Sequence, residues 1–194
     1  LMWERVHNLS ETEWLSYTKN SDWLVRGLAK FIAQNTEASV VLGIVEYGPD
    51  VEATRRLVRE LNLERYVMWL PIMPRKELLL LLSAADIGVG EFKTDPGMIW
   101  GGTGWEVLAA GRPLLQSFNF TEEKFMEQFG HPAPPVLDVK SADDIAKHLS
   151  EIYNDPGKGH GTGAACLDWF NRHNGIRLAK KWLSLLRKTD ETMV

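Results

Sequence analysis

A glycine-rich run near the middle of the chain leads into a predicted helix over about residues 103–110. Backbone N–H groups at the start of such a helix, together with the helix dipole, can bind a phosphate group. We therefore expect Gly101, Gly102 and Thr103 to approach a phosphate, because glycine lets the backbone come close to a ligand. Glu106 lies in the first turn, where its carboxylate could accept hydrogen bonds from two ribose hydroxyls. The alternative is that the dipole favours a Glu near this end and the glycines only form the turn.

The rest of the chain lacks the motifs of several other enzyme classes. The glycines between residues 157 and 163 follow a predicted helix and lack the spacing of a P-loop. The five histidines are scattered and Cys166 is the single cysteine, so we expect neither a zinc site nor a disulfide. No strand is followed by Gly-x-Gly-x-x-Gly with an acid about 20 residues later, which argues against a dehydrogenase.

Predicted strands and helices alternate along the chain, which indicates an α/β fold, a Rossmann-like parallel sheet with helices on both faces. The run 39–45 is continuously apolar and rich in β-branched residues, which is typical of a strand buried on both faces. The apolar run from Leu78 to Leu82 predicts a helix in the core. Helices are expected over 21–34, 51–62, 74–82, 103–110, 122–129 and 142–154, and strands over 1–6, 39–45, 66–70, 86–90, 113–116 and 135–137.

Sheets of this kind bind their ligands beyond the carboxyl ends of the strands. The functional residues are therefore expected in the segments that follow strands. These segments are 5–19, 46–49, 70–73, 91–104 and 116–119.

The composition divides the chain into one main domain and a C-terminal extension. We expect a nucleotide-sugar-binding domain over residues 1–154, a glycine-rich linker over 155–163, a C-terminal helix or helices over 164–188 and a tail over 189–194. The C-terminal helical region is predicted to break at Asn174-Gly175. Trp182 follows the apolar periodicity of the final helix, which favours a place in the core.

Charge and hydropathy exclude two classes of partner. The net charge of −4 argues against a nucleic-acid-binding domain, which usually carries a basic excess. No stretch approaches the roughly 18 to 20 apolar residues of a transmembrane helix, and no signal peptide is evident. The chain begins at Leu1 without an initiator Met, so we expect a fragment, and the lone cysteine fits a reducing, cytoplasmic location.

Several motifs, in order, resemble the C-terminal, donor-binding domain of GT-B glycosyltransferases, specifically the retaining family 4, or group 1. The most specific is Glu106-Val107-Leu108-Ala109-Ala110-Gly111-Arg112-Pro113, which is similar to Glu-Ala-Met-Ala-x-Gly-x-Pro of that family. The resemblance covers about residues 19–154. The other similar pieces are Lys19-Asn20-Ser21-Asp22, Glu46-Tyr47-Gly48-Pro49-Asp50, Val67-Met68-Trp69-Leu70-Pro71 and Ser83-Ala84-Ala85-Asp86-Ile87.

The resemblance assigns roles around the sugar and the ribose. In such enzymes the last motif begins as Glu-x₇-Glu, and its second Glu, here Glu106, holds the ribose of the nucleotide. The first Glu contacts the donor sugar, but Met98 stands at that position, while Glu91 and Asp95 are carboxylates off register. The backbone N–H groups from Gly97 onward would then reach the sugar.

The resemblance also implies cations on the diphosphate. Lys19 and Arg5 match a Lys and an Arg that neutralise the charge building up on the leaving nucleotide. The alternative for both is an ordinary solvated surface cation. Backbone groups of Leu70 and Pro71 are expected to recognise the nucleobase, and Gly48 to form the turn after its strand at the same site.

The function implied is the donor half of a metal-independent glycosyltransferase, which needs no cofactor and transfers a sugar from a UDP-sugar or GDP-sugar to an acceptor. An N-terminal acceptor domain would be missing, so the fragment would be inactive alone, and any peripheral contact with a membrane would be made by that missing domain. In GT-B proteins the last helix crosses back to the N-terminal domain, whereas here it could also pack on its own domain. The alternatives are another Rossmann-like nucleotide-binding enzyme or a non-catalytic glycosyltransferase-like interaction domain.

Overall fold

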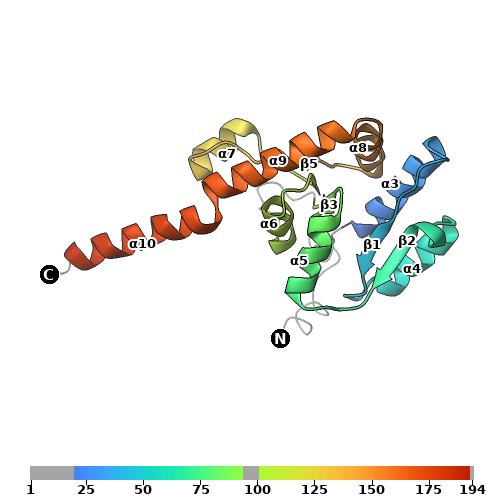
Figure 1. Cartoon of the computed structure of the whole chain (residues 1–194), viewed down its shortest axis with the longest axis horizontal. Helices are drawn as coiled ribbons and strands as arrows, with labels where there is room; N and C mark the ends of the chain where they lie inside the picture. Colours follow the sequence, from blue (N-terminus) through green and yellow to red (C-terminus); the bar gives the residue numbers. More distant parts are fainter. Residues whose placement is uncertain (1–19, 94–100, 193–194) are drawn as a thin grey trace, which may run out of the picture.

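The structure is a computed structural model and describes residues 20–93 and 101–192. It confirms the predicted α/β class, because parallel strands alternate with helices that flank them (Figure 1). The strands are β1 (Leu42–Val45), β2 (Val67–Leu70), β3 (Gly88–Val89), β4 (Leu114–Gln116) and β5 (Leu137–Asp138). The helices are α3 (Ser21–Gln34), α4 (Val51–Glu60), the 3₁₀ helix η1 (Glu64–Tyr66), α5 (Arg75–Ala84), α6 (Gly102–Ala109), α7 (Glu122–Phe129), α8 (Ala142–Asn154), α9 (Pro156–His173) and α10 (Gly175–Thr192).

The strands form two parallel sheets rather than one. β1 pairs with β2, and β4 lies between β3 and β5. The neighbouring helices α3 and α8 connect the two sheets. Ala146 of α8 belongs to the core beside β1 and β2, while Leu24 of α3 packs on the core that contains Leu115 of β4. The two helices therefore pack against both sheets and join them into one core region.

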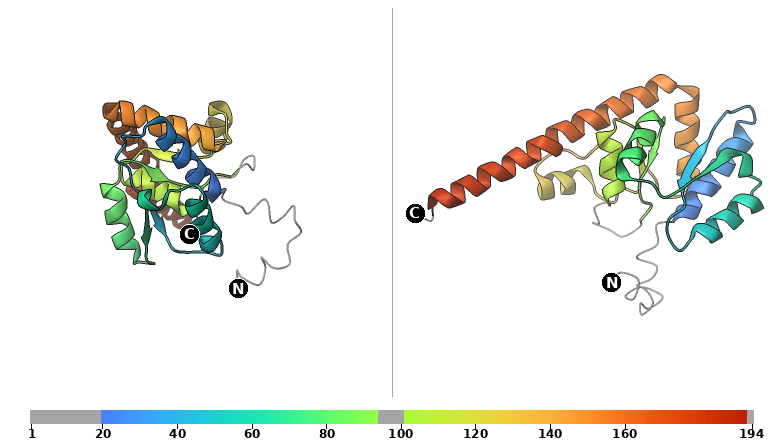
Figure 2. Two further views of the ribbon diagram at one scale, coloured as in Figure 1. Left: turned by 90° about the vertical axis from the view of Figure 1, so that its right-hand side faces the viewer. Right: turned by 60° about the horizontal axis from the view of Figure 1, so that its bottom comes forward.

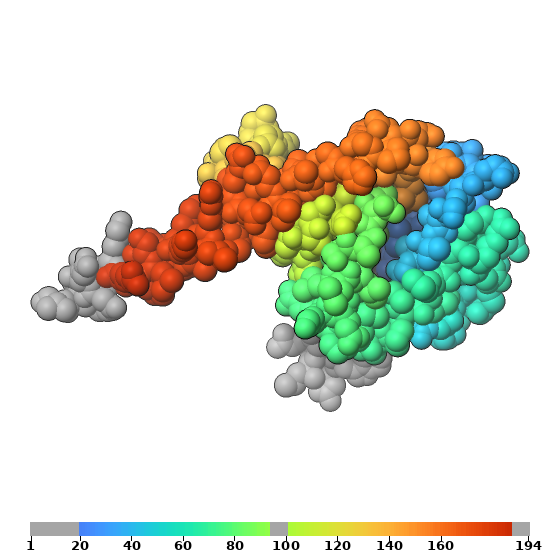
Figure 3. All heavy atoms as spheres, in the orientation of Figure 1, coloured from blue at the N-terminus to red at the C-terminus, as the bar shows by residue number. Residues whose placement is uncertain are grey.

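The sheet of β1 and β2 is covered on one face. Leu42 and Ile44 of β1 point into the core that α3 and α4 complete. On the opposite face Val41 is 64% exposed and Met68 is 48% exposed. The expectation of a strand buried on both faces is therefore wrong for the described structure. A hollow separates α5, in green, from these strands, in blue and teal (Figure 3).

Helix α5 is not a core helix. None of its ten residues is buried, and Leu80 is 62% exposed. The apolar run from Leu78 to Leu82 covers most of the circumference of a helix, so one contact with the body cannot bury all of it. Leu82 packs against the core of α6, which is the side that holds α5 in place.

Residues 156–163 are the first turns of α9, so the expected linker over 155–163 is wrong there. Asp155 starts this helix, because its side chain accepts a hydrogen bond from the N–H of Lys158 at 3.1 Å. The glycines serve packing rather than flexibility. A Cβ on Gly163 would lie 2.3 Å from the carbonyl oxygen of Gly111, so the two backbones touch where α9 crosses the end of α6.

The described chain ends in two long consecutive helices, of which α9 packs along α6 and α8 and α10 projects away from the rest of the molecule (Figures 1 and 2). The predicted break is confirmed, since α9 ends at His173 and α10 begins at Gly175, whose φ is 56°. Trp182 of α10 is 60% exposed, so its predicted place in the core is wrong. No helix within residues 20–93 and 101–192 combines the length and the apolar character that crossing a membrane requires.

Candidate functional site

Glu106 joins two elements at the carboxyl side of the strands. It is the fifth residue of α6, which begins at Gly102, so it lies one turn into the helix rather than in its first turn. Its Oε1 forms an ion pair with Nη2 of Arg75 at 2.8 Å, and the Glu106 side chain is 15% exposed. Arg75 is the first residue of α5 and follows the segment 70–73. This contact therefore joins the residue predicted to bind the ribose to the helix that begins directly after the segment predicted to recognise the nucleobase.

Among the described residues, none covers the N-terminus of α6 at the predicted phosphate position. Gly101 is the residue before the helix, in extended conformation, and no side chain caps it. Gly102 and Thr103 are exposed, and a Cβ on Gly102 would meet nothing within 4 Å in the described structure. A helix of eight residues with an open first turn can accept an anion through its N–H groups and its dipole.

A buried carboxylate lies directly behind this turn. Glu91 is only 7% exposed, and its Oε2 pairs with the Nζ of Lys93 at 3.2 Å. A Cβ on Gly101 would lie 2.8 Å from Oε1 of Glu91, so the carboxylate rests against the backbone that starts α6. By sequence alone Glu91 lies off register with the first Glu of the family motif. Its approach to Gly101 is a contact between residues ten apart in the chain, which sequence periodicity does not predict.

Gln116 fixes the position of Glu91. The N–H of Glu91 donates to Oε1 of Gln116 at 2.9 Å, and Nε2 of Gln116 donates back to the carbonyl oxygen of Glu91. Gln116 is itself buried, at the carboxyl end of β4. A buried side chain that satisfies both backbone groups of a neighbour holds that segment rigidly.

Polar side chains also surround the ends of β4 and β5. The amide nitrogen of Asn119 donates to the carbonyl oxygen of Lys93 at 2.9 Å. Lys140 donates to Oδ1 of Asn119 at 2.7 Å and pairs with Asp138 at 3.1 Å. Lys140 was not predicted as a site residue, and it brings a cation to the same edge as Lys93.

The start of α3 is tied to this edge. Asn20 adopts the left-handed conformation, with φ of 45°, and its side chain makes no cap hydrogen bond to the helix. Its Nδ2 instead donates to the carbonyl oxygen of Phe92 at 2.6 Å. The sequence predicts the helix start correctly, but the side chain anchors α3 to the segment after β3.

The predicted residues after β1 and β2 lie at the carboxyl ends of their strands. Gly48 has a φ of 110°, which favours glycine, and a Cβ there would meet none of the described residues within 4 Å. The N–H of Glu46 donates to the carbonyl oxygen of Leu70 at 2.9 Å, so the two strand ends stay paired. Pro71 follows and is exposed. The described contacts connect the β2 end to Glu106, through Arg75, and no such contact connects Gly48 to it.

Four predicted site residues, Arg5, Lys19, Gly97 and Met98, lie outside the described residues. Within the described ranges, no three His, Cys, Asp or Glu side chains gather as metal ligands would.

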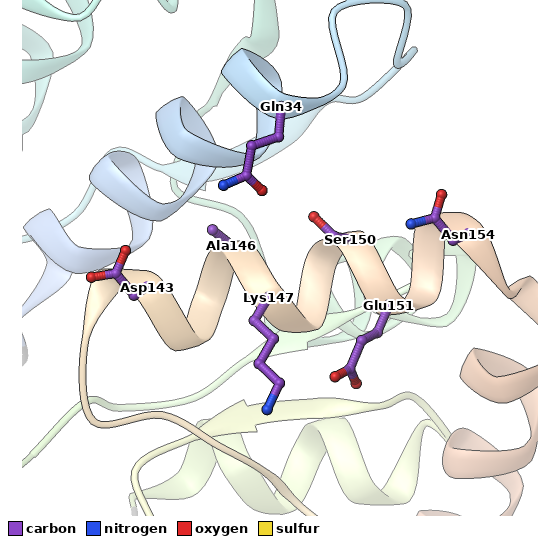
Figure 4. A pocket seen from close by; sticks show the side chains of 7 residues that line it. All are labelled: Gln34, Asp143, Ala146, Lys147, Ser150, Glu151 and Asn154. Atoms are coloured by element: carbon purple, nitrogen blue, oxygen red, sulfur yellow. The ribbon is translucent and has the colours of Figure 1, made fainter.

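A separate hollow lies along α8 and is lined by polar side chains from α3 and α8 (Figure 4). Ser150 points toward Gln34 at the end of α3, whereas Lys147 and Glu151 point away from it. None of the predicted site residues lines this hollow. It therefore does not belong to the site around Glu106.

No protein-family profile matches the sequence, and no curated protein is significantly similar to it. Solved structures are similar in fold. HepE from Anabaena, in complex with UDP, aligns over 90% of this chain and 46% of its own, with a TM-score of 0.65 and 19% identity. Sucrose-phosphate synthase from Thermosynechococcus elongatus aligns over 90% of this chain and 44% of its own, with a TM-score of 0.65 and 18% identity.

The pneumococcal O-GlcNAc transferase GtfA, in complex with UDP and GlcNAc, aligns over 90% of this chain and 34% of its own, with a TM-score of 0.65 and 16% identity. These neighbours are GT-B glycosyltransferases. At such identities the likeness shows the fold, which is the Rossmann-like domain of that class. The chain spans less than half the length of each of these three proteins.

Proposed function

We propose that the chain is the C-terminal, donor-binding domain of a retaining glycosyltransferase similar to family 4, and that it binds a UDP-sugar or GDP-sugar. The observation that carries the proposal is the contact of Glu106 with Arg75 beside the open N-terminus of α6. This contact joins a carboxylate near the start of α6 to the helix that follows β2, and a helix start of this kind can accept an anion. The fold of UDP-bound glycosyltransferases supports the same assignment.

The nucleotide would span this edge from the β2 end to α6. The backbone of Leu70 and Pro71 would recognise the base, and Glu106 would accept hydrogen bonds from the ribose hydroxyls. The N–H groups at Gly101, Gly102 and Thr103 would then hold a phosphate. Arg75 keeps the carboxylate of Glu106 paired before the nucleotide arrives, and it is 74% exposed, so it can move aside cheaply.

The leaving diphosphate would be neutralised by Lys19 and Arg5. Support for Lys19 comes from its chain neighbour Asn20, whose hydrogen bond to Phe92 places the start of α3 at the site edge. Charge neutralisation by such cations stabilises the transition state without a metal ion, so we propose a metal-independent reaction. Met98 in place of a Glu would leave the sugar to backbone donors from Gly97 onward.

The acceptor would bind a second, N-terminal domain that these residues do not include. We accordingly propose that the chain alone binds nucleotide and transfers nothing, and that the whole enzyme works in the cytoplasm. Any metal dependence of binding is checked by adding EDTA, which should leave the affinity for UDP unchanged.

The test is calorimetric titration of the chain with UDP, GDP and 2′-deoxy-UDP. Glu106→Gln should weaken UDP binding by about 10- to 100-fold, because hydrogen bonds to a charged group are worth about 1.5–3 kcal/mol. The preference for UDP over 2′-deoxy-UDP should shrink in that variant, since the two changes remove the same interaction. Glu127→Gln, an exposed carboxamide exchange on α7, serves as the matched control.

Failure of all nucleotides to bind would contradict the proposal. Equal loss of UDP and 2′-deoxy-UDP affinity in Glu106→Gln would retain a nucleotide site but refute the ribose role. Binding of NAD in preference to UDP would favour another class of Rossmann-like enzyme.

A further inference from the structure

Arg75 is a cation in a position that the stability of its own helix does not explain. It is the first residue of α5, where the helix dipole disfavours a positive charge. The residues three and four positions further along are Leu78 and Leu79, so α5 offers it no ion pair on its own face. Its described ionic partner is instead Glu106 on α6, at 2.8 Å. The reason for a guanidinium here therefore lies in the site to which Glu106 belongs.

This ion pair brings the guanidinium toward the first turn of α6. α5 and α6 lie side by side (Figures 1 and 2). Gly102 and Glu106 are four residues apart, so they share one face of α6. Helical side chains lean toward the N-terminus of their helix, over the preceding turn. The carboxylate of Glu106 and the guanidinium of Arg75 therefore lie on the side of the N–H groups that would hold a phosphate.

The ion pair is suited to exchange. The Arg75 side chain is 74% exposed, and an ion pair with a partner so exposed to water contributes little to stability. Its long, flexible stem lets the guanidinium turn while α5 stays in place. A phosphate group can bind a guanidinium through two parallel hydrogen bonds, which makes it a strong competing partner. There is space for such a group, since a Cβ on Gly102 would meet no described residue within 4 Å.

We propose that Arg75 is a phosphate ligand that the nucleotide itself releases from Glu106. This inference rests on the proposed function, because Glu106 has to bind the ribose first. The two ribose hydroxyls donate to the carboxylate in place of the guanidinium. The guanidinium then turns to the phosphate at the start of α6 and donates to its oxygens.

The exchange gives Arg75 opposite effects on two kinds of ligand. A nucleoside has to displace the guanidinium from Glu106 and gains nothing in return. A nucleotide displaces the same guanidinium and then pairs with it. Arg75 is therefore a specificity residue that makes the site prefer a phosphorylated nucleoside over the free nucleoside.

The test is NMR titration of the full 194-residue chain with uridine, UMP and UDP, and with guanosine, GMP and GDP. Arg75→Gln should weaken the binding of UMP and UDP, or of GMP and GDP, at least about tenfold, because a charge-assisted contact with the phosphate is lost. The same variant should bind the nucleoside as tightly as the native chain or up to about threefold more tightly, because Glu106 no longer has a competing partner.

Two further variants control for charge and for side-chain shape. Lys76→Gln removes a positive charge from the next residue of α5, which is also exposed, and should change every affinity by less than about threefold. Arg75→Lys keeps the charge but not the planar, two-pronged donor, so it should restore only part of the preference for the nucleotide. Because the Arg75 side chain is exposed, circular dichroism should show the same fold in all three variants.

Equal weakening of nucleoside and nucleotide binding in Arg75→Gln would overturn this inference but leave the proposed function standing, because the guanidinium would then contact the base or only hold Glu106 in place. Equal losses of nucleotide affinity in Arg75→Gln and Lys76→Gln would overturn it too, since general attraction between charges would be enough. If none of the six ligands binds the native chain, the proposed function fails, and this inference fails with it.

Discussion

Two adjacent glycines at the start of α6 are expected to serve different purposes. Gly101 touches Glu91, since a Cβ there would lie 2.8 Å from its carboxylate, whereas a Cβ on Gly102 would meet no described residue within 4 Å. Gly101→Ala should therefore lower stability by about 1 kcal/mol, because a buried, paired carboxylate has to shift.

Gly102→Ala should leave stability within about 0.5 kcal/mol but weaken UDP binding, because a methyl group would stand where the phosphate approaches. Urea unfolding and calorimetric titration separate the two effects. If Gly102→Ala binds UDP as tightly as the native chain does, the phosphate does not lie against this glycine.

The thiol of Cys166 is expected to be unreactive toward alkylating reagents in the folded protein. It is fully buried, and desolvation by burial raises the pKa of its thiol to about 11 from an ordinary 9.0. The thiolate is the reactive form, so iodoacetamide at pH 8.5 should label the native chain far more slowly than the chain in guanidinium. Mass spectrometry measures both rates, and rapid labelling of the native chain would contradict the burial.

The raised pKa of Cys166 makes the stability of the folded protein depend on pH. The unfolded chain ionises Cys166 first, near its ordinary pKa, while the folded chain keeps the thiol protonated until about pH 11. The contribution of this group is therefore fully present below pH 9 and is lost as the pH rises toward 11. Cys166→Ala should show a shallower fall in stability over this range.

At the scale of elements, the packing of α9 depends on which glycine is changed. A Cβ on Gly163 would meet the carbonyl oxygen of Gly111 at 2.3 Å, and backbone must move to relieve it. Gly163→Ala should cost about 2–3 kcal/mol, or roughly 4–12 °C in Tm for a chain of this size.

Gly161→Ala is the matched control on the same helix. Its Cβ would meet nothing within 4 Å, so the higher helix propensity of alanine should raise stability by about 0.5–1 kcal/mol. Thermal unfolding followed by circular dichroism measures both variants. A similar change in both, of either sign, would show that α9 does not cross α6 at this point.

The sequence predicts elements well where the signal is local. α7 and α8 begin and end where expected, because Thr121 and Ser141 cap them through side-chain oxygens that accept backbone N–H bonds. It fails where the deciding contact is distant in the chain. The glycines before Gly163 indicate a flexible linker until Gly111 is known to press against that helix.

The same distinction between local signals and contacts distant in the chain applies to the candidate site. The helix start that carries the glycine run and Glu106 is predictable, because a helix start after a strand is a local pattern. The ion pair of Glu106 with Arg75 and the approach of Glu91 to Gly101 are not, since each joins residues from different elements. Periodicity carries no information about such pairs.

At the scale of the whole molecule, the strand order leaves one position open. Two sheets with orders β1-β2 and β3-β4-β5 become the doubly wound order if a single strand is inserted between β1 and β3. Among the described strands, neither β1 nor β3 has a partner on that side. The predicted first strand, Leu1–Val6, would be the central strand of such a sheet, and it lies outside the described residues.

Deleting residues 1–6 should therefore destabilise the chain more than deleting 189–194. A central strand contributes hydrogen bonds on both edges and apolar contacts on both faces, so we expect Tm to fall by more than about 5 °C. Binding of a hydrophobic dye should also increase after the deletion, because the apolar surface of β1 and β3 beside the open position would lose its neighbouring strand. Equal Tm values and equal dye binding for the two truncations would mean that Leu1–Val6 does not complete the sheet, and that the open position is filled by residues from elsewhere.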